Sequence, residues 1–113
     1  MPTLEADGKS VEVTDNGYLV DSNEWTKAIG QKIADLDELE MTEEHWDVID
    51  YLRAEHAENP GSEANERGIM KEMAKKWGKK LTSKYMYQLF PGMPSKQGRK
   101  IGGLSQSTRK GGY

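Results

Sequence analysis

A stripe of apolar side chains in the middle of the chain constrains the fold more than any other feature. The stripe follows Thr42 and two glutamates, and glutamates stabilise the positive end of a helix dipole. Its members recur at helical spacing: Trp46, Ile49, Leu52 and His56. Asn59-Pro60-Gly61 then ends the pattern, because proline cannot continue a helix. The sequence therefore predicts an amphipathic helix that begins at Thr42 and ends near residue 59.

Three further helices are predicted on the same grounds. The first spans about residues 23 to 35, after N-cap residue types at 21–23, with an apolar stripe of Trp25, Ala28, Ile29, Ile33 and Leu36. The second begins near Ser62 and ends at Gly78, and the third begins at Ser83 and ends before Pro91. These last two helices form a helix-turn-helix pattern, which also occurs in proteins that never contact DNA.

The N-terminal residues predict a β-hairpin. Asp7-Gly8 separates two short extended runs, and Asp-Gly supplies the positive φ angles that a two-residue turn requires. Asn16-Gly17 is a second turn signal, followed by a short extended return over residues 18–20. Together these elements predict a mainly α fold class: a small helical bundle with a helix-turn-helix, an N-terminal β-hairpin and a flexible C-terminal arm.

The composition changes at Pro91. From there to the end, the chain contains six glycines, two prolines, five basic residues and no acid. Residues 94 to 101 predict one short helix that Gly102-Gly103 ends, and little after Leu104 is apolar enough to be buried. We therefore expect a single domain over residues 1–103 and a flexible basic arm over residues 104–113.

The absence of several sequence features excludes whole classes of protein. The chain has no cysteine, so disulfides, thiolate metal sites and thiol nucleophiles are excluded. It has no run of about 18 apolar residues and no secretory signal, which predicts a cytoplasmic protein without a membrane span. His45 and His56 are eleven residues apart, about 16 Å along one helix, so we expect no metal or cofactor. No catalytic motif is present, and we do not expect an enzyme.

Charge is divided unevenly between two parts of the chain. Residues 1–66 carry 18 acidic and 4 basic side chains, a formal charge of −14, whereas residues 67–113 carry 1 acidic and 12 basic, a charge of +11. Either the two parts neutralise each other within one fold, or the basic part faces an anionic partner. The cations without acidic neighbours in sequence favour a partner: Lys96, Arg99, Lys100, Arg109 and Lys110. A disordered, solubilising tail would have the same composition.

The aromatic residues also allow two interpretations. Trp25, Trp46 and Trp77 fall on the apolar stripes of three predicted helices, which favours packing in the core. Tyr85 and Phe90 lie near a lysine, as in surfaces that stack on nucleic-acid bases. A short helix packed on a core would show the same pattern.

Four stretches of the sequence resemble the DsrC/TusE family, also called the gamma subunit of dissimilatory sulfite reductase. They are the hairpin DGKSVEVTDNGYL, the helix TEEHWDVIDYLR, the basic stretch around Arg67 and Lys71, and SKYMYQLFPGMPSKQGRKIGGL. The resemblance extends from about Asp7 to Thr108. It implies a hairpin on a helical bundle with a flexible C-terminal arm, and a sulfur carrier that acts with sulfite reductase or with sulfur-relay proteins.

The resemblance also places two family cysteines that this chain lacks. Arg99 stands where DsrC proteins carry one of them, and Lys110 stands where the near-terminal family cysteine lies. Ser105 and Ser107 replace prolines of the family's terminal stretch. Neither lysine nor arginine forms a persulfide or a disulfide, so this chain cannot transfer sulfur through a thiol.

We therefore expect a cysteine-free family member, monomeric, that docks on or regulates a sulfite reductase or a sulfur-relay complex. Its expected partner contacts are the five C-terminal cations and, as a secondary basic surface, Arg67 and Lys84. The alternative is a nucleic-acid-binding regulator built on the helix-turn-helix. The charge of +11 on residues 67–113 supports that alternative, whereas the charge of −14 on residues 1–66 opposes it.

Overall fold

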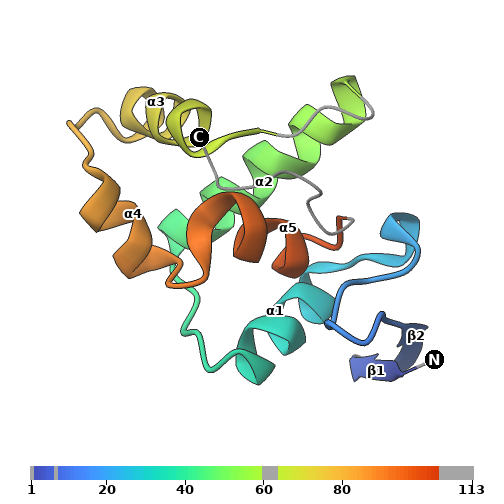
Figure 1. Ribbon diagram of the computed structural model, residues 1–113. Helices are drawn as coiled ribbons and strands as arrows, with labels where there is room; N and C mark the ends of the chain where they lie inside the picture. The colour runs from blue at the N-terminus through green and yellow to red at the C-terminus, as the bar shows by residue number, and fades with distance from the viewer. Residues whose placement is uncertain (1, 7, 60–63, 105–113) are drawn as a thin grey trace.

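A two-stranded sheet and a set of packed helices make up the structure (Figure 1). The computed structural model describes residues 2–6, 8–59 and 64–104. Its elements are β1 (Thr3–Ala6), β2 (Lys9–Glu12), a 3-10 turn η1 (Ser22–Glu24), α1 (Lys27–Leu36), α2 (Glu43–Glu58), α3 (Glu66–Trp77), α4 (Ser83–Leu89), a π-helical turn η2 (Met93–Gln97) and α5 (Gly98–Ile101). The predicted mainly α fold class is confirmed for the helical bundle, the N-terminal hairpin and the helix-turn-helix, whose two helices are α3 and α4. Residues 105–113 of the predicted flexible arm lie outside the described residues.

The N-terminal hairpin packs one of its faces on the helices. Strands β1 and β2 are antiparallel, with Leu4 opposite Val11, and both side chains are buried. A second turn brings Leu19 back beside Val13, and these two side chains are buried as well. Because successive side chains of a strand point to opposite faces, every second residue reaches the core. The predicted hairpin and the predicted second turn are both confirmed.

The first predicted helix is wrong at its beginning. Residues 22–24 form the 3-10 turn η1, Trp25 is extended, and α1 begins only after Thr26, whose Oγ1 accepts the Ile29 N–H at 3.3 Å. The physical reason is that Trp25 bonds to a distant part of the chain and leaves the helical path. The prediction that Leu36 belongs to the apolar stripe is also wrong. Leu36 is the last residue of α1, and its side chain is 64% exposed.

Helix α2 begins and ends as predicted, and a buried histidine fixes its first turn. The Nδ1 atom of His45 accepts the Thr42 N–H at 3.0 Å, which satisfies a backbone donor at the helix end. Its Nε2 atom therefore carries the proton and donates to the carbonyl oxygen of Leu89 at 2.6 Å. His45 thus joins the start of α2 to the end of α4, and both of its nitrogens serve the fold.

Helices α3 and α4 begin close to the predicted positions. Asn65 caps α3 by accepting the Gly68 N–H at 2.8 Å, a few residues after the predicted start, and residues 60–63 lie outside the described part of the chain. Thr82, rather than the predicted Ser83, caps α4 by accepting the Tyr85 N–H at 3.2 Å. Both caps are residue types whose short side-chain oxygen reaches the free N–H groups of a first turn.

The core lies where the helices meet the hairpin. Its largest fully buried side chains come from α1, α2, α3 and residues 90–104: Ile29, Ile33, Val48, Ile49, Ile69, Phe90, Pro94, Ile101 and Leu104. The three tryptophans pack against this core as predicted, but each is only half-buried at its rim. No helix among the described residues is long and apolar enough to cross a membrane.

Removing the imidazole of His45 should weaken the joint between α2 and α4. His45→Ala leaves the Leu89 carbonyl and the Thr42 N–H without their partner, so we expect the free energy of unfolding to fall by about 2 kcal/mol. Urea denaturation followed by circular dichroism measures this loss. His56→Ala, at a half-buried position on the same helix, is the control and should cost less than about 1 kcal/mol. Equal losses in the two variants would contradict the assigned role.

Candidate functional site

Residues 93–104, here called the C-terminal segment, are built into the domain rather than attached to its surface. They comprise η2, α5 and the three residues after α5, and Figure 1 shows α5 lying between α1 and α2. The fit is close at Gly98, where an added Cβ atom would lie 2.7 Å from the Cδ1 atom of Leu52 on α2. The predicted helix over residues 94–101 is thus present, half of it as a π-helical turn.

A buried carboxylate holds the beginning of the segment. Glu66, the first residue of α3, accepts the Ser95 N–H at 2.6 Å through its Oε1 atom, and both residues are buried. A buried N–H group without a partner would cost on the order of 1–3 kcal/mol, so this bond stabilises the π-helical turn on α3.

Asp37, the C-cap residue of α1, holds the middle of the segment. Its Oδ1 atom lies 2.7 Å from the ammonium of Lys100, and its Oδ2 atom accepts from the Gln97 Nε2 at 3.3 Å. The hydroxyl of Tyr18 donates to the Lys96 carbonyl at 3.4 Å. Burial and the charge of Asp37 raise the pKa of Tyr18, and the nearby Arg99 partly opposes this shift. The hairpin side and α1 therefore both contact the segment.

Trp25 and Arg53 hold the end of the segment. The Trp25 Nε1 donates to the Ile101 carbonyl at 2.7 Å, and the Arg53 Nη1 donates to the next carbonyl, that of Gly102, at 2.5 Å. The guanidinium of Arg53 also stacks 4.4 Å above the Trp25 ring, and its Nη2 donates to the Ser22 carbonyl at 3.4 Å. Burial lowers the pKa of Arg53 from its ordinary value.

A tight turn then ends α5. The Leu104 N–H donates to the Arg99 carbonyl at 2.9 Å and the Gly103 N–H to the Lys100 carbonyl at 3.2 Å, the pair of bonds of a helix C-cap. Gly103 has a φ of +71°, and an added Cβ atom would lie 2.4 Å from the Cδ1 atom of Trp25. Leu104 is 1% exposed, so the buried domain includes the residue at which the arm was predicted to begin.

The predicted contact residues lie in three different settings. Arg99 is 4% exposed and interacts within the domain, Lys100 pairs with Asp37, and Lys96 is half-buried. The two predicted secondary residues, Arg67 and Lys84, are exposed on α3 and α4. Arg109 and Lys110 lie outside the described residues. That any of these side chains contacts a partner stays a prediction.

The residues that hold the C-terminal segment were not identified from the sequence. Glu66 and Asp37 look like any other carboxylate of the acidic part of the chain, and Trp25 was assigned to a helix stripe. Arg53 carried one signal, because it is the only arginine among residues 1–66. A lone guanidinium in an acidic stretch indicates a bonding role that a lysine would not fulfil.

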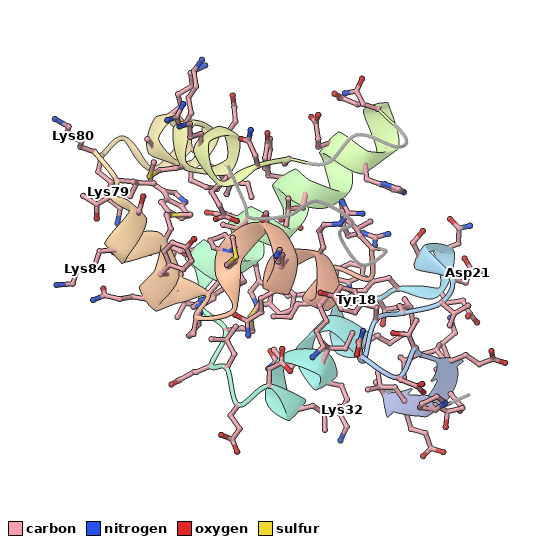
Figure 2. The ribbon with its side chains drawn as sticks, in the orientation of Figure 1. Tyr18, Asp21, Lys32, Lys79, Lys80 and Lys84 are labelled. Atoms are coloured by element: carbon pink, nitrogen blue, oxygen red, sulfur yellow. The ribbon has the colours of Figure 1, made fainter. Side chains whose placement is uncertain are left out.

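The two oppositely charged parts of the chain meet at a second cluster, between α2 and the turn before α4. The Lys79 ammonium lies 2.8 Å from the Glu44 Oε2 and 3.1 Å from the Tyr85 hydroxyl, which itself donates to Glu44. Lys76 pairs with Asp47 at 3.7 Å. Figure 2 shows Lys79, Lys80 and Lys84 along one edge of the molecule. Part of the charge imbalance is therefore neutralised inside the fold, as one of the two interpretations predicted.

No group of metal-ligating side chains gathers within the described residues. Between α2 and α3 lies an open groove of about 300 Å³, whose lining includes Asp47, Tyr51, Glu72 and Lys76. Two of these groups are already engaged, since Asp47 accepts from Trp77 at 2.8 Å and pairs with Lys76. Among the described residues, the candidate site is therefore the group of polar side chains that bonds the C-terminal segment.

Comparison with known proteins identifies the family of the chain. A family model described as "DsrC like protein" matches residues 5–109. The chain belongs to the DsrC/TusE family. Sulfurtransferase TusE of Yersinia pestis is 37% identical over 107 residues, which cover 94% of this chain and 97% of TusE. The DsrC structure from Allochromatium vinosum superposes with a TM-score of 0.84 at 40% identity and covers 96% of both chains.

A second solved structure extends the family likeness to an archaeal protein. The oxidized gamma-subunit of the dissimilatory sulfite reductase (DsrC) from Archaeoglobus fulgidus superposes with a TM-score of 0.86 at 31% identity, covering 96% of this chain and 99% of that one. The family resemblance predicted from the sequence is thereby confirmed, and it places the protein in sulfur metabolism. None of these relatives is named as a nucleic-acid-binding regulator.

A side chain at Gly103 should disrupt the end of the C-terminal segment. Gly103→Ala sets a Cβ atom against Trp25 in addition to the strain of a positive φ, so we expect the free energy of unfolding to fall by about 3 kcal/mol. Gly78→Ala is the matched control, because Gly78 has a φ of +64° and no atom within 4 Å of an added Cβ. It should cost about 1 kcal/mol in the same thermal or urea denaturation. A smaller loss for Gly103→Ala than for Gly78→Ala would refute the close fit.

Acid should release the contact between Glu44 and Lys79. The hydrogen bonds from Lys79 and then from Tyr85 lower the pKa of Glu44 from 4.5, so its stabilising contribution is present above pH 4.5 and lost as the pH falls through the folded-state pKa. We expect Glu44→Gln to lower the free energy of unfolding at pH 7 by about 0.5 kcal/mol, a difference that shrinks below pH 4. Glu43→Gln removes the same charge from the same helix turn and is the control. An unchanged difference at acid pH would contradict this assignment.

Proposed function

We propose that this protein docks on a sulfur-metabolism enzyme through the residues beyond Leu104 and regulates that enzyme without carrying sulfur. The proposal is supported by a full family scaffold combined with a complete absence of cysteine. A sulfur carrier of this family type needs a thiolate, which forms the persulfide or the disulfide. Neither species is available to this chain, whereas the surfaces and the arm through which it could bind a partner remain.

The observation that carries the proposal is the set of contacts that hold the C-terminal segment in the domain. Residues 93–104 remain bonded to α1, α2 and α3 in a chain whose likeness to DsrC covers 96% of its length. Arg99, which stands in one of the cysteine positions, has become part of the buried domain. These contacts hold Leu104 in a fixed place on the domain, which gives an arm that docks a defined starting point.

The composition of the predicted arm suits an anionic binding channel. Residues 105–113 contain Arg109 and Lys110 and no acid, so their side chains carry two positive charges. We take the partner to be the catalytic part of dissimilatory sulfite reductase or a sulfur-relay complex of the same cell. By occupying the arm channel of such an enzyme, this chain would exclude a relative that bears cysteine. Regulation by competition follows from binding alone and needs no chemistry by this chain.

The nucleic-acid alternative is not proposed here, because no specific observation favours it. Lys76 and Lys79, which lie at the turn of the helix-turn-helix, are paired with acidic residues of α2. The expectations of a monomer and of a cytoplasmic location stay predictions.

Binding to the purified catalytic subunits of dissimilatory sulfite reductase tests the proposed function. We expect the full chain to bind, and a version that ends at Leu104 to bind at least about 10-fold more weakly, because the arm supplies the contacts. The truncation keeps Leu104, since this residue is part of the core. Surface plasmon resonance measures both affinities, and a competition series with a cysteine-bearing DsrC tests whether the two proteins share one site.

Charge variants supply the matched control. Arg109→Ala with Lys110→Ala removes two cations from the arm and should weaken binding, whereas Lys9→Ala with Lys32→Ala removes two exposed cations from the opposite part of the chain and should not. Equal affinity of the full chain and the truncated chain would refute docking through the arm. Failure of the full chain to bind either the reductase or the relay proteins would refute the proposed function as a whole.

A further inference from the structure

Trp25 and Arg53 hold two consecutive carbonyl groups just before Leu104, the last residue that the structure describes. We infer that these two side chains are positioning residues, which fix the direction in which the backbone continues beyond Leu104. This inference rests on the proposed function in one respect only, namely that the departing residues dock on a partner.

The first step of the argument concerns the peptide groups themselves. α5 spans only Gly98–Ile101, so its last carbonyls cannot all find partners inside so short a helix. The Ile101 carbonyl accepts from Trp25 at 2.7 Å and the Gly102 carbonyl from Arg53 at 2.5 Å. Two adjacent peptide planes are therefore held by side chains from two different parts of the fold, which leaves little rotation about the bonds between them.

The second step concerns the two side chains that form this contact. The Arg53 guanidinium stacks 4.4 Å above the Trp25 ring while its Nη2 donates to the Ser22 carbonyl at 3.4 Å. Each of the two groups thus fixes the orientation of the other. Core packing alone explains a half-buried ring, but it does not require the indole N–H to bond to a carbonyl or a guanidinium to lie over the ring.

The third step concerns the residues that follow. Gly103 lies so close to Trp25 that a Cβ atom would overlap the ring, and Leu104 is buried with its N–H bonded to the Arg99 carbonyl. Four consecutive residues, 101 to 104, are each fixed by a bond or by close packing. The backbone at Leu104 therefore has a set direction, and a fixed starting point reduces the conformational freedom that the following residues lose on docking.

A distance measurement tests the inference without any partner. Because the chain lacks cysteine, Lys32→Cys and Gln106→Cys introduce two unique sites for spin labels. Lys32 projects from α1 into solvent (Figure 2), and residue 106 is two positions beyond Leu104. Pulsed electron paramagnetic resonance measures the distances between the two labels. We expect Arg53→Met and Trp25→Phe each to widen the distribution of these distances by about twofold or more. Trp25→Phe keeps an aromatic ring but removes the N–H donor together with part of the ring's volume.

Lys27→Met is the matched control. Lys27 lies 4.9 Å above the ring of Trp46, so this variant removes a cation from an aromatic face outside the C-terminal segment and should leave the distribution unchanged. If Arg53→Met fails to fold, as judged by circular dichroism, Arg53→Lys replaces it, because lysine keeps the charge and loses the planar stack. An unchanged distribution in the folded Arg53 and Trp25 variants would overturn the inference.

Binding then separates this inference from the proposed function. We expect Arg53→Met to lower the affinity of the full chain for the sulfite reductase subunits by about tenfold. The affinity of the chain ending at Leu104 should not change. An equal loss in both lengths would indicate a general structural effect and would overturn the positioning role. If the parent chain does not bind at all, the proposed function fails, whereas the label distances still decide whether Trp25 and Arg53 direct the arm.

Discussion

The backbone of a helix only four residues long cannot satisfy its own polar groups, and the structure depends on the side chains that do so. α5 and the π-helical turn before it lie inside the core, where each unpaired N–H or carbonyl group would be costly. Side chains from the other parts of the fold supply the partners of these backbone groups, namely Glu66, Trp25 and Arg53, and Asp37 binds the Lys100 and Gln97 side chains of the same segment. The acidic part of the chain therefore serves as the frame on which the basic part is assembled.

Sequence reasoning found the elements of this fold but not the bonds that arrange them. Apolar spacing and cap residues sufficed for α2, α3 and α4, because these signals lie within one or two helix turns. The predicted start of α1 was too early because Trp25 bonds to Ile101, a residue 76 positions away. No local pattern records such a pairing, and the same holds for Lys100 and Asp37, which are 63 positions apart.

The candidate site shows the same division. Family motifs predicted the family and the two positions at which cysteine is replaced, and the comparisons confirm the family. Exposure of the C-terminal cations could not be predicted, since Arg99 is buried and Lys100 is paired only in the folded chain. From the sequence, Gly103 was predicted only to end a helix. In the structure, its lack of a side chain also makes room for the indole ring of Trp25.

The central position of the C-terminal segment has a consequence for biosynthesis. Ile101 and Leu104 fill the middle of the core, but they are among the last residues of the domain to leave the ribosome. Before these residues emerge, α1 and α2 lack the apolar side chains of α5 that pack against them. The acidic N-terminal part of the chain therefore has an incomplete hydrophobic core during this time. The domain therefore completes its folding only after α5 and Leu104 have emerged, so a nascent chain that stops before α5 exposes its apolar surface to chaperones and proteases.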